Sequence, residues 1–152
     1  MELAPNRPRL AVRAIILHRG RLLLVNAWPN GESDLWCAPG GGAEPGVSLP
    51  DNLRRELCEE CGLQIDVGPL ALVNEFHDPA SGFHQVELFF RCTLLSDELP
   101  RDWCDPSGVV SRRHFFTRAE LSGIRLKPGS LARVAFDPSA SVYYDPLETM
   151  VR

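Results

Sequence analysis

The chain has 152 residues, which is the length of one compact domain. Its composition, 44% hydrophobic and 24% charged, excludes a disordered tail, a collagen-like fibre and a miniprotein that depends on disulfides. A formal net charge of −4 argues against a protein that binds the phosphates of nucleic acid. The sequence contains no apolar run near the roughly 20 residues that cross a bilayer, and it shows no signal peptide. We therefore expect a cytoplasmic protein without membrane contact.

Short apolar runs alternate with candidate turns and helices along the chain. We expect strands at 11–17, 22–25, 35–38, 64–76 and 83–95, a hairpin at 18–21, a loop at 78–82, and helices at 48–61, about 117–121 and about 129–136. Strands interleaved with a few helices predict a mixed α/β or α+β layered domain. No repeat or linker interrupts the chain, so we expect a single domain over 1–152. Residues 142–145 are either a surface edge strand or an arm to a second subunit, which leaves a homodimer open.

The helix at 48–61 has recognisable ends. Ser48 and Asp51 match a capping box, in which the serine hydroxyl accepts from the third helical residue and the acid reaches back. Pro50 lies in the first turn, where backbone N–H groups have no partner within the helix. Gly62 supplies the left-handed residue that commonly ends a helix. These signals predict the helix independently of its hydrophobic pattern.

Acidic residues on this helix lie beside its apolar stripe. At about 100° per residue, the leucines at positions 49, 53 and 57 form the buried stripe, Glu60 falls between two of them, and Glu56 borders them. Glu59 follows three residues after Glu56. A solvated acidic face would instead place these acids opposite the leucines. Because partly buried like charges repel, we expect either raised pKa values or a bound cation, and oxygen ligands suit a hard divalent ion such as Mg²⁺.

Three consecutive glycines precede the helix. Gly40, Gly41 and Gly42 would let the backbone approach a ligand or a metal closely, although a plain turn explains the run when it is taken alone. Together with the acidic helix, the glycines predict a loop–helix unit at which a metal and a phosphate meet.

These residues resemble the Nudix box, G-x5-E-x7-R-E-U-x-E-E-x-G-U, in which U is an aliphatic residue. Gly41 opens the box, and residues 55–63, with the sequence RELCEECGL, complete it without a mismatch. The first glutamate of the box, generally a supporting residue often paired with the box arginine, falls at Val47 in this chain; Glu44 is a candidate replacement outside the register. The resemblance, over about residues 41–63, implies an α/β fold of the Nudix type, an α/β/α sandwich with a mixed β-sheet.

The resemblance also implies an activity. A Nudix pyrophosphohydrolase would hydrolyse the diphosphate linkage of a small nucleotide, a nucleoside diphosphate joined to a group X, such as a nucleoside triphosphate or a nucleotide sugar. It implies that Glu56, Glu59 and Glu60 bind Mg²⁺ or Mn²⁺ and that Arg55 orients the carboxylates. Metal ions would offset the charge of the diphosphate while water attacks phosphorus.

Further positions of the predicted site follow from the same resemblance. The carbonyl of Gly40 or Gly41 would complete the metal ligands. The proton acceptor is either Glu56 or Glu87; for Glu87, on the expected strand at 83–95, an exposed strand residue is an equally good interpretation.

Residues outside the acidic helix are candidates for contact with the nucleotide. The expected substrate contacts within the glycine run and the first strand are Gly41, Gly42 and Arg13. Trp28 either stacks a nucleobase or packs at the rim of the site. Phe83 and Trp36 are instead assigned to core packing. Stacking tolerates every base, so the identity of the nucleotide stays open.

Two other functions are compatible with the sequence. Val47 motivates a Nudix-like domain that binds a nucleotide or regulates a partner without catalysis. Cys58 and Cys61 form a CxxC pair, but a redox CxxC normally lies at a helix N-terminus and this pair lies at the C-terminal end, where the helix dipole disfavours thiolate. The odd number of cysteines, five, fits a reduced intracellular state.

Overall fold

The computed structural model describes residues 7–96, 99–100, 103–139 and 141–152; residues 1–6, which bear on the expected lack of a signal peptide, lie outside this part. In chain order the elements are β1 (Arg9–His18), β2 (Arg21–Asn26), β3 (Leu35–Cys37), β4 (Gly40–Gly42), α1 (Leu49–Cys61), β5 (Ile65–Asp78), β6 (Phe83–Leu94), β7 (Arg113–Thr117), α2 (Arg118–Leu121), β8 (Arg125–Leu126), α3 (Leu131–Phe136) and β9 (Tyr143–Thr149). Within the described ranges, none of the helices has the length and apolar character that a membrane crossing requires.

The strands form one mixed sheet around the long strand β1. The strand order is β8-β3-β2-β1-β6-β5-β9, with β4 paired to β1 and β7 paired to β2. Three of the pairs are parallel, namely β1 with β6, β5 with β9 and β3 with β8. Strand β1 therefore pairs with β2, β4 and β6. Its position determines where the glycine strand β4 and the side chains of β6 lie relative to each other.

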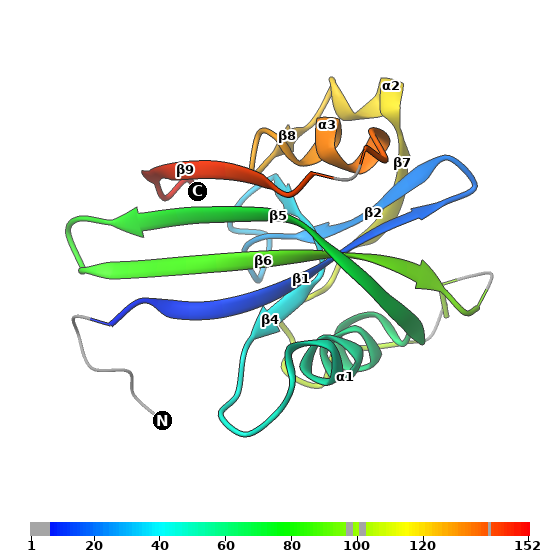
Figure 1. Ribbon diagram of the computed structural model, residues 1–152, viewed down its shortest axis with the longest axis horizontal. Coiled ribbons are helices and arrows are strands. Elements are labelled where there is room, and N and C mark those ends of the chain that lie inside the picture. Colours follow the sequence, from blue (N-terminus) through cyan, green and yellow to red (C-terminus); the bar gives the residue numbers. More distant parts are fainter. Residues whose placement is uncertain (1–6, 97–98, 101–102, 140) are drawn as a thin grey trace.

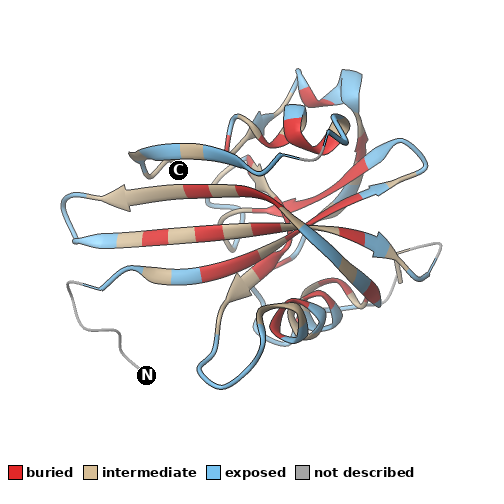
Figure 2. Ribbon diagram, viewed as in Figure 1, coloured by how far each residue is buried: buried red, intermediate tan, exposed pale blue. Residues whose placement is uncertain are grey.

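Helices cover both faces of the sheet. Figure 1 shows α1 on one side of the strands and α2 with α3 on the other. Each side has its own apolar core: the helix residues in one are Leu53, Leu57 and Cys61, and those in the other include Leu121 and Leu131. Buried and less buried residues alternate along the central strands, as Figure 2 shows. The arrangement confirms the expected α/β/α sandwich with a mixed sheet.

Helix α1 has the predicted ends. The Ser48 hydroxyl accepts a hydrogen bond from the backbone N–H of Asp51 at 3.2 Å, and Gly62 has a φ of 68° and donates its N–H to Cys58. The bond to Ser48 is one arm of the predicted capping box. The carboxylate of Asp51, expected to form the other arm, accepts from Arg54 at 2.7 Å in an ion pair. These caps fix where the helix starts, and therefore which of its residues face the sheet.

The other elements agree with expectation except for the three short strands β4, β7 and β8. The hairpin at 18–21 pairs His18 with Arg21. The glycine run, expected as a loop, is strand β4, and β7 and β8 were not predicted. Residues 143–149 form β9, parallel to β5, so the edge-strand interpretation is confirmed.

Candidate active site

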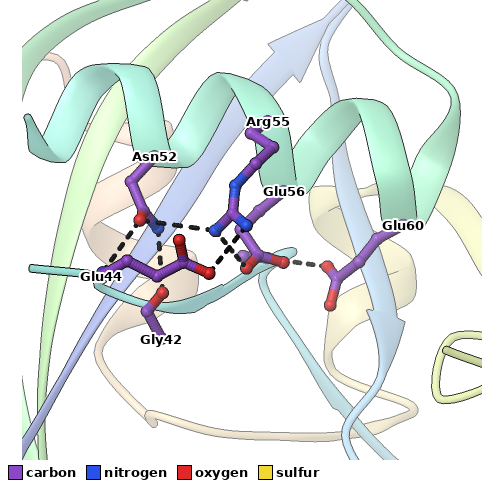
Figure 3. A network of polar contacts seen from close by, with 7 residues as sticks. Gly42, Glu44, Asn52, Arg55, Glu56 and Glu60 are labelled. Atoms are coloured by element: carbon purple, nitrogen blue, oxygen red, sulfur yellow. Dashed lines mark hydrogen bonds and ion pairs between the residues drawn. The ribbon is translucent and has the colours of Figure 1, made fainter. Parts of the chain in front are cut away.

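Two carboxylates of α1 face each other beside the glycine strand. Glu56 and Glu60 lie one turn apart, and Figure 3 shows their carboxyl groups pointing toward one another. Glu59 lies between them in sequence and is exposed. In the described part of the chain, no three His, Cys, Asp or Glu side chains are gathered closely enough to hold a metal ion. The geometry therefore brings together two of the three predicted metal ligands, and the role of Glu59 stays a prediction.

The two facing acids have raised pKa values. Burial raises the pKa of Glu60 to about 7; Arg13 and the N–H of Gly40 act in the opposite direction, and Glu56 adds to the rise. Burial also raises the pKa of Glu56, which Arg55 partly opposes. Both carboxyl groups are thus held where their negative charge is poorly compensated.

The glycine strand makes room for these acids. The N–H of Gly40 donates to Oε2 of Glu60 at 3.1 Å. A Cβ at Gly41 would lie 2.5–2.7 Å from the carboxyl atoms of Glu56. A Cβ at Gly40 would lie 1.9 Å from the carbonyl oxygen of Val12 on the neighbouring strand. Glycine is therefore required at position 40, where a side chain would meet the backbone of β1, and a side chain at position 41 would displace the carboxylate of Glu56.

Asn52 joins the helix to the segment that follows the glycine strand. Its side chain is fully buried, donates to the carbonyl of Gly42 at 3.0 Å and accepts from the N–H of Glu44 at 3.0 Å (Figure 3). These two bonds use both ends of the carboxamide, so they fix its orientation. The helix and the glycine strand consequently hold a set position relative to each other.

Arg55 pairs with Glu44, not with a residue at position 47. Its Nη1 lies 2.9 Å from Oε1 of Glu44, and its Nη2 lies 3.3 Å from Oε1 of Glu56 (Figure 3). Val47 is 41% exposed. Arg55 is thus paired with a glutamate three residues before position 47, and it also contacts Glu56.

A second pair of charges lies on the adjoining strands. Nε of Arg13 on β1 lies 2.6 Å from Oε2 of Glu87 on β6, with side chains 17% and 8% exposed. Gln85 donates to the same oxygen of Glu87 at 3.1 Å. Burial alone would lower the pKa of Arg13, but the Glu87 carboxylate raises it above its usual value. Glu87 is therefore a buried ion-pair partner, and the interpretation as an exposed strand residue is wrong.

A cavity of about 570 Å³ opens beside these charges. Arg9 and Arg13 line it, whereas Glu56 and Glu60 are not among the described residues of its walls; the charges of these acids act on Arg9 and Arg13 respectively. Its other walls include Trp28, Phe76, Phe83, Asn74, Lys127 and residues 148–152. The volume and the mixed apolar and polar lining are typical of a small-molecule site.

Trp28 lies at the rim of this cavity. Its Nε1 donates to the carbonyl of Val151 at 3.1 Å, and the guanidinium of Arg152 lies 4.3 Å from the ring centroid. Trp28 thus both lines the cavity and packs against the last residues, so rim packing is confirmed and base stacking stays a prediction.

Two aromatic assignments separate in the structure. Trp36 packs edge-on against Phe116, with ring centroids 5.0 Å apart, beside the second core, so its core assignment is confirmed. Phe83 is 37% exposed, lines the cavity and lies 6.0 Å from Phe76, so its core assignment is wrong. It follows the turn at 79–82, where the strand emerges from the layers that would bury it.

The thiol interpretation finds no support in the geometry of the CxxC pair. Cys58 is exposed, whereas Cys61 is buried in the core, so the two thiols do not share a surface. Burial raises the pKa of the Cys61 thiol, which keeps it protonated.

Three residues of the site were not predicted from the sequence: Arg9, Asn52 and Gln85. Asn52 had a detectable signal, since it is a polar residue four before Glu56 beside the leucine stripe. Arg9 and Gln85 lie opposite each other only because β1 and β6 pair in parallel, and 76 positions separate them in the sequence.

Known proteins resemble this chain in sequence and in fold. Over 94 residues it is 29% identical to YjhB of Bacillus subtilis, a match that covers 60% of this chain and 44% of that protein. The chain thus spans less than half the length of this relative. A UDP-X diphosphatase has a TM-score of 0.70 at 23% identity, covering 95% of this chain and 70% of that one. An ADP-ribose pyrophosphatase from Streptococcus suis has a TM-score of 0.65 at 24% identity, covering 93% and 98%.

The two structural likenesses, each under 25% identity, show a shared fold. The family model described as the NUDIX domain matches residues 7–136, which include the acidic helix, the glycine strand and the charged pair on β1 and β6. Since this match covers most of the chain, the protein belongs to the NUDIX domain family.

Proposed function

We propose that the protein hydrolyses the diphosphate linkage of a nucleoside diphosphate joined to a group X, with Mg²⁺ or Mn²⁺ as the metal. The observation that carries the proposal is the facing pair Glu56 and Glu60, whose charges act on two arginines that line a cavity of about 570 Å³. Structural neighbours named as a UDP-X diphosphatase and an ADP-ribose pyrophosphatase support this class of substrate.

The donor set fits a hard divalent ion. Glu56 and Glu60 offer carboxylate oxygens at a position where burial raises both pKa values, so a cation would favour their ionised forms. We assign the metal to these two residues, to Glu59 and to the carbonyl of Gly40. A divalent ion bound there would neutralise charge on the phosphoryl oxygens and lower the pKa of water.

The remaining residues hold the reacting groups in place. Arg55, anchored by Glu44, orients the carboxylate of Glu56. We assign proton acceptance to Glu56, because the Oε2 of Glu87 already accepts from both Arg13 and Gln85. The backbone of Gly41, free of a side chain, would pass close to the diphosphate.

The cavity provides a place for the nucleoside. Trp28, Phe76 and Phe83 offer aromatic surface, and Asn74 offers a carboxamide. Aromatic stacking stabilises every base. The proposal therefore specifies a nucleoside diphosphate-X class and not one nucleotide.

The test is a hydrolysis panel of nucleoside triphosphates, ADP-ribose and UDP-sugars with Mg²⁺, in which products are identified by chromatography. We expect turnover of at least one compound, and a loss of at least about 10²-fold in Glu60→Gln, because the variant keeps the shape but not the charge. Glu32→Gln, an exposed glutamate in the loop between β2 and β3, is the matched control and should retain full activity. Nucleotide binding without turnover would instead support the non-catalytic alternative.

A further inference from the structure

Two arginines of β1 line the cavity, and different groups hold them. Arg9 and Arg13 are four residues apart, so they project from the same face of the strand. Arg13 forms a buried ion pair with the carboxylate of Glu87. In the described part of the chain, the hydrogen-bond partner of Arg9 is the neutral side-chain carbonyl of Gln85. One guanidinium is therefore matched by a negative charge and the other by a dipole.

The orientation of Gln85 is fixed by its second contact. Gln85 is 2% exposed, lies opposite Arg9 in the parallel pairing of β1 and β6, and donates its amide N–H to Glu87 at 3.1 Å. Because the NH₂ end faces a carboxylate, the carbonyl end faces Arg9. The chain Arg13–Glu87–Gln85–Arg9 thus positions the guanidinium of Arg9 without neutralising it.

The charge of Arg9 is partly desolvated. Burial lowers the pKa of Arg9, the charge of Arg13 lowers it further, and Glu56 and Glu87 act in the opposite direction. An arginine side chain remains protonated under such conditions. A partly buried cation that keeps unused N–H donors favours the approach of an anion.

Arg9 also lies against the glycine strand. A Cβ at Gly42 would lie 2.4 Å from Nη2 of Arg9, just as a Cβ at Gly41 would meet the carboxylate of Glu56. Because successive residues of a strand point to opposite faces, Arg9 and Glu56 lie against opposite faces of β4, and the charge of Glu56 still acts on Arg9.

We propose that Arg9 binds a phosphate of the diphosphate substrate through its guanidinium, and that Arg13 serves to hold Glu87. This inference rests on the proposed function and gives Arg9 a substrate contact of the kind that the sequence suggested for Arg13. The planar fork of arginine donates two parallel hydrogen bonds to phosphate oxygens, which the point charge of lysine does not reproduce.

The test is calorimetric titration of the full chain with methylenediphosphonate, a diphosphate that is not hydrolysed, at fixed Mg²⁺. We expect Arg9→Gln to weaken binding by at least about tenfold and Arg9→Lys to weaken it less, because lysine restores the charge alone. Gln85→Met keeps the charge of Arg9 but removes its anchor, and should give an intermediate loss. Arg54→Gln, which removes an exposed arginine of α1, is the matched control and should bind as the wild type does.

Steady-state kinetics on a turned-over nucleotide provide a second readout. Arg9→Gln should raise KM more than it lowers kcat, and thermal unfolding without ligand should show that the variant remains folded. Equal diphosphonate binding by wild type and Arg9→Gln overturns the role of Arg9, as does a wild type that binds no diphosphonate. Nucleotide hydrolysis by that same preparation would leave the proposed function standing.

Discussion

Two pairs of partly buried charges lie close to the glycine strand in space. One pair joins opposite charges and the other joins like charges. Arg13 and Glu87 are opposite charges, and their side chains are in contact at 2.6 Å. Glu56 and Glu60 are like charges, and burial raises both of their pKa values. The first pair is complete within the protein, while the second favours a cation from solution. The comparison separates residues that maintain the architecture from residues to which we assign a bound ion.

The strongest test of this comparison removes one member of the complete pair. Glu87→Met leaves the guanidinium of Arg13 buried without a carboxylate, and we expect the free energy of unfolding to fall by about 3–5 kcal/mol. Urea denaturation measures this change. The double variant Arg13→Met with Glu87→Met should be more stable than Glu87→Met alone, because no unpaired charge remains buried. Equal stability of the single and double variants would show that the pair is not energetically coupled.

The second test follows the like-charge pair with pH in metal-free protein. The pKa of Glu60 rises from an ordinary 4.5 to about 7. Between these pH values the folded state binds more protons than the unfolded state. The contribution of Glu60 to the free energy of unfolding is therefore fully present below pH 4.5 and is lost as the pH rises toward 7. The loss from this group is about 3 kcal/mol.

Urea denaturation at several pH values, with a chelator present, measures that loss. Glu60→Gln should flatten the profile between pH 4.5 and 7, whereas Glu32→Gln should keep it. Magnesium should stabilise the wild type more at pH 7.5 than it stabilises Glu60→Gln, since ions that bind the folded state alone raise its stability. A wild-type profile without a decline over this interval would contradict the raised pKa.

The smallest expected effect concerns an exposed pair of opposite charges. The side chains of Glu44 and Arg55 are 56% and 37% exposed, and their charged atoms lie 2.9 Å apart. Glu44→Gln should therefore lower the free energy of unfolding by less than about 1 kcal/mol. Activity should fall more than stability does, by up to about tenfold in kcat, because Arg55 also contacts Glu56. Parallel denaturation and kinetics measure the two effects, with Glu32→Gln as the control. Unchanged kcat would show that Glu44 does not take over the role of the glutamate that is missing at position 47.

Apolar runs and helix caps were sufficient to predict most of the architecture. The strands β1, β2, β5 and β6 follow from their apolar residues, and the ends of α1 follow from Ser48 and Gly62. Strand β4 could not be predicted, because three glycines carry no side-chain pattern and become a strand only by pairing with β1. Strand β8 has two residues, too few for any periodicity.

The acids could be predicted and their surroundings could not. Glu56 and Glu60 lie on one helix, where spacing alone determines which face they share. The contacts of Arg9 and Arg13 depend on the register between β1 and β6, which lie far apart in the sequence. A shift of that register by one residue would move Glu87 to the opposite face. The contact of Glu44 with Arg55 depends on a loop whose path the sequence does not specify.

The buried amide of Asn52 has a consequence for how substrate preference can change. It ties the glycine strand to α1, so the half of the site that carries the acids has little freedom to adapt. The far wall of the cavity is made of short segments around Trp28, Phe83 and Arg152, joined in part by one indole hydrogen bond. If the proposed function holds, replacing those segments would alter which group is admitted while leaving Glu56 and Glu60 unchanged, so new specificities can be engineered there without altering the acidic pair.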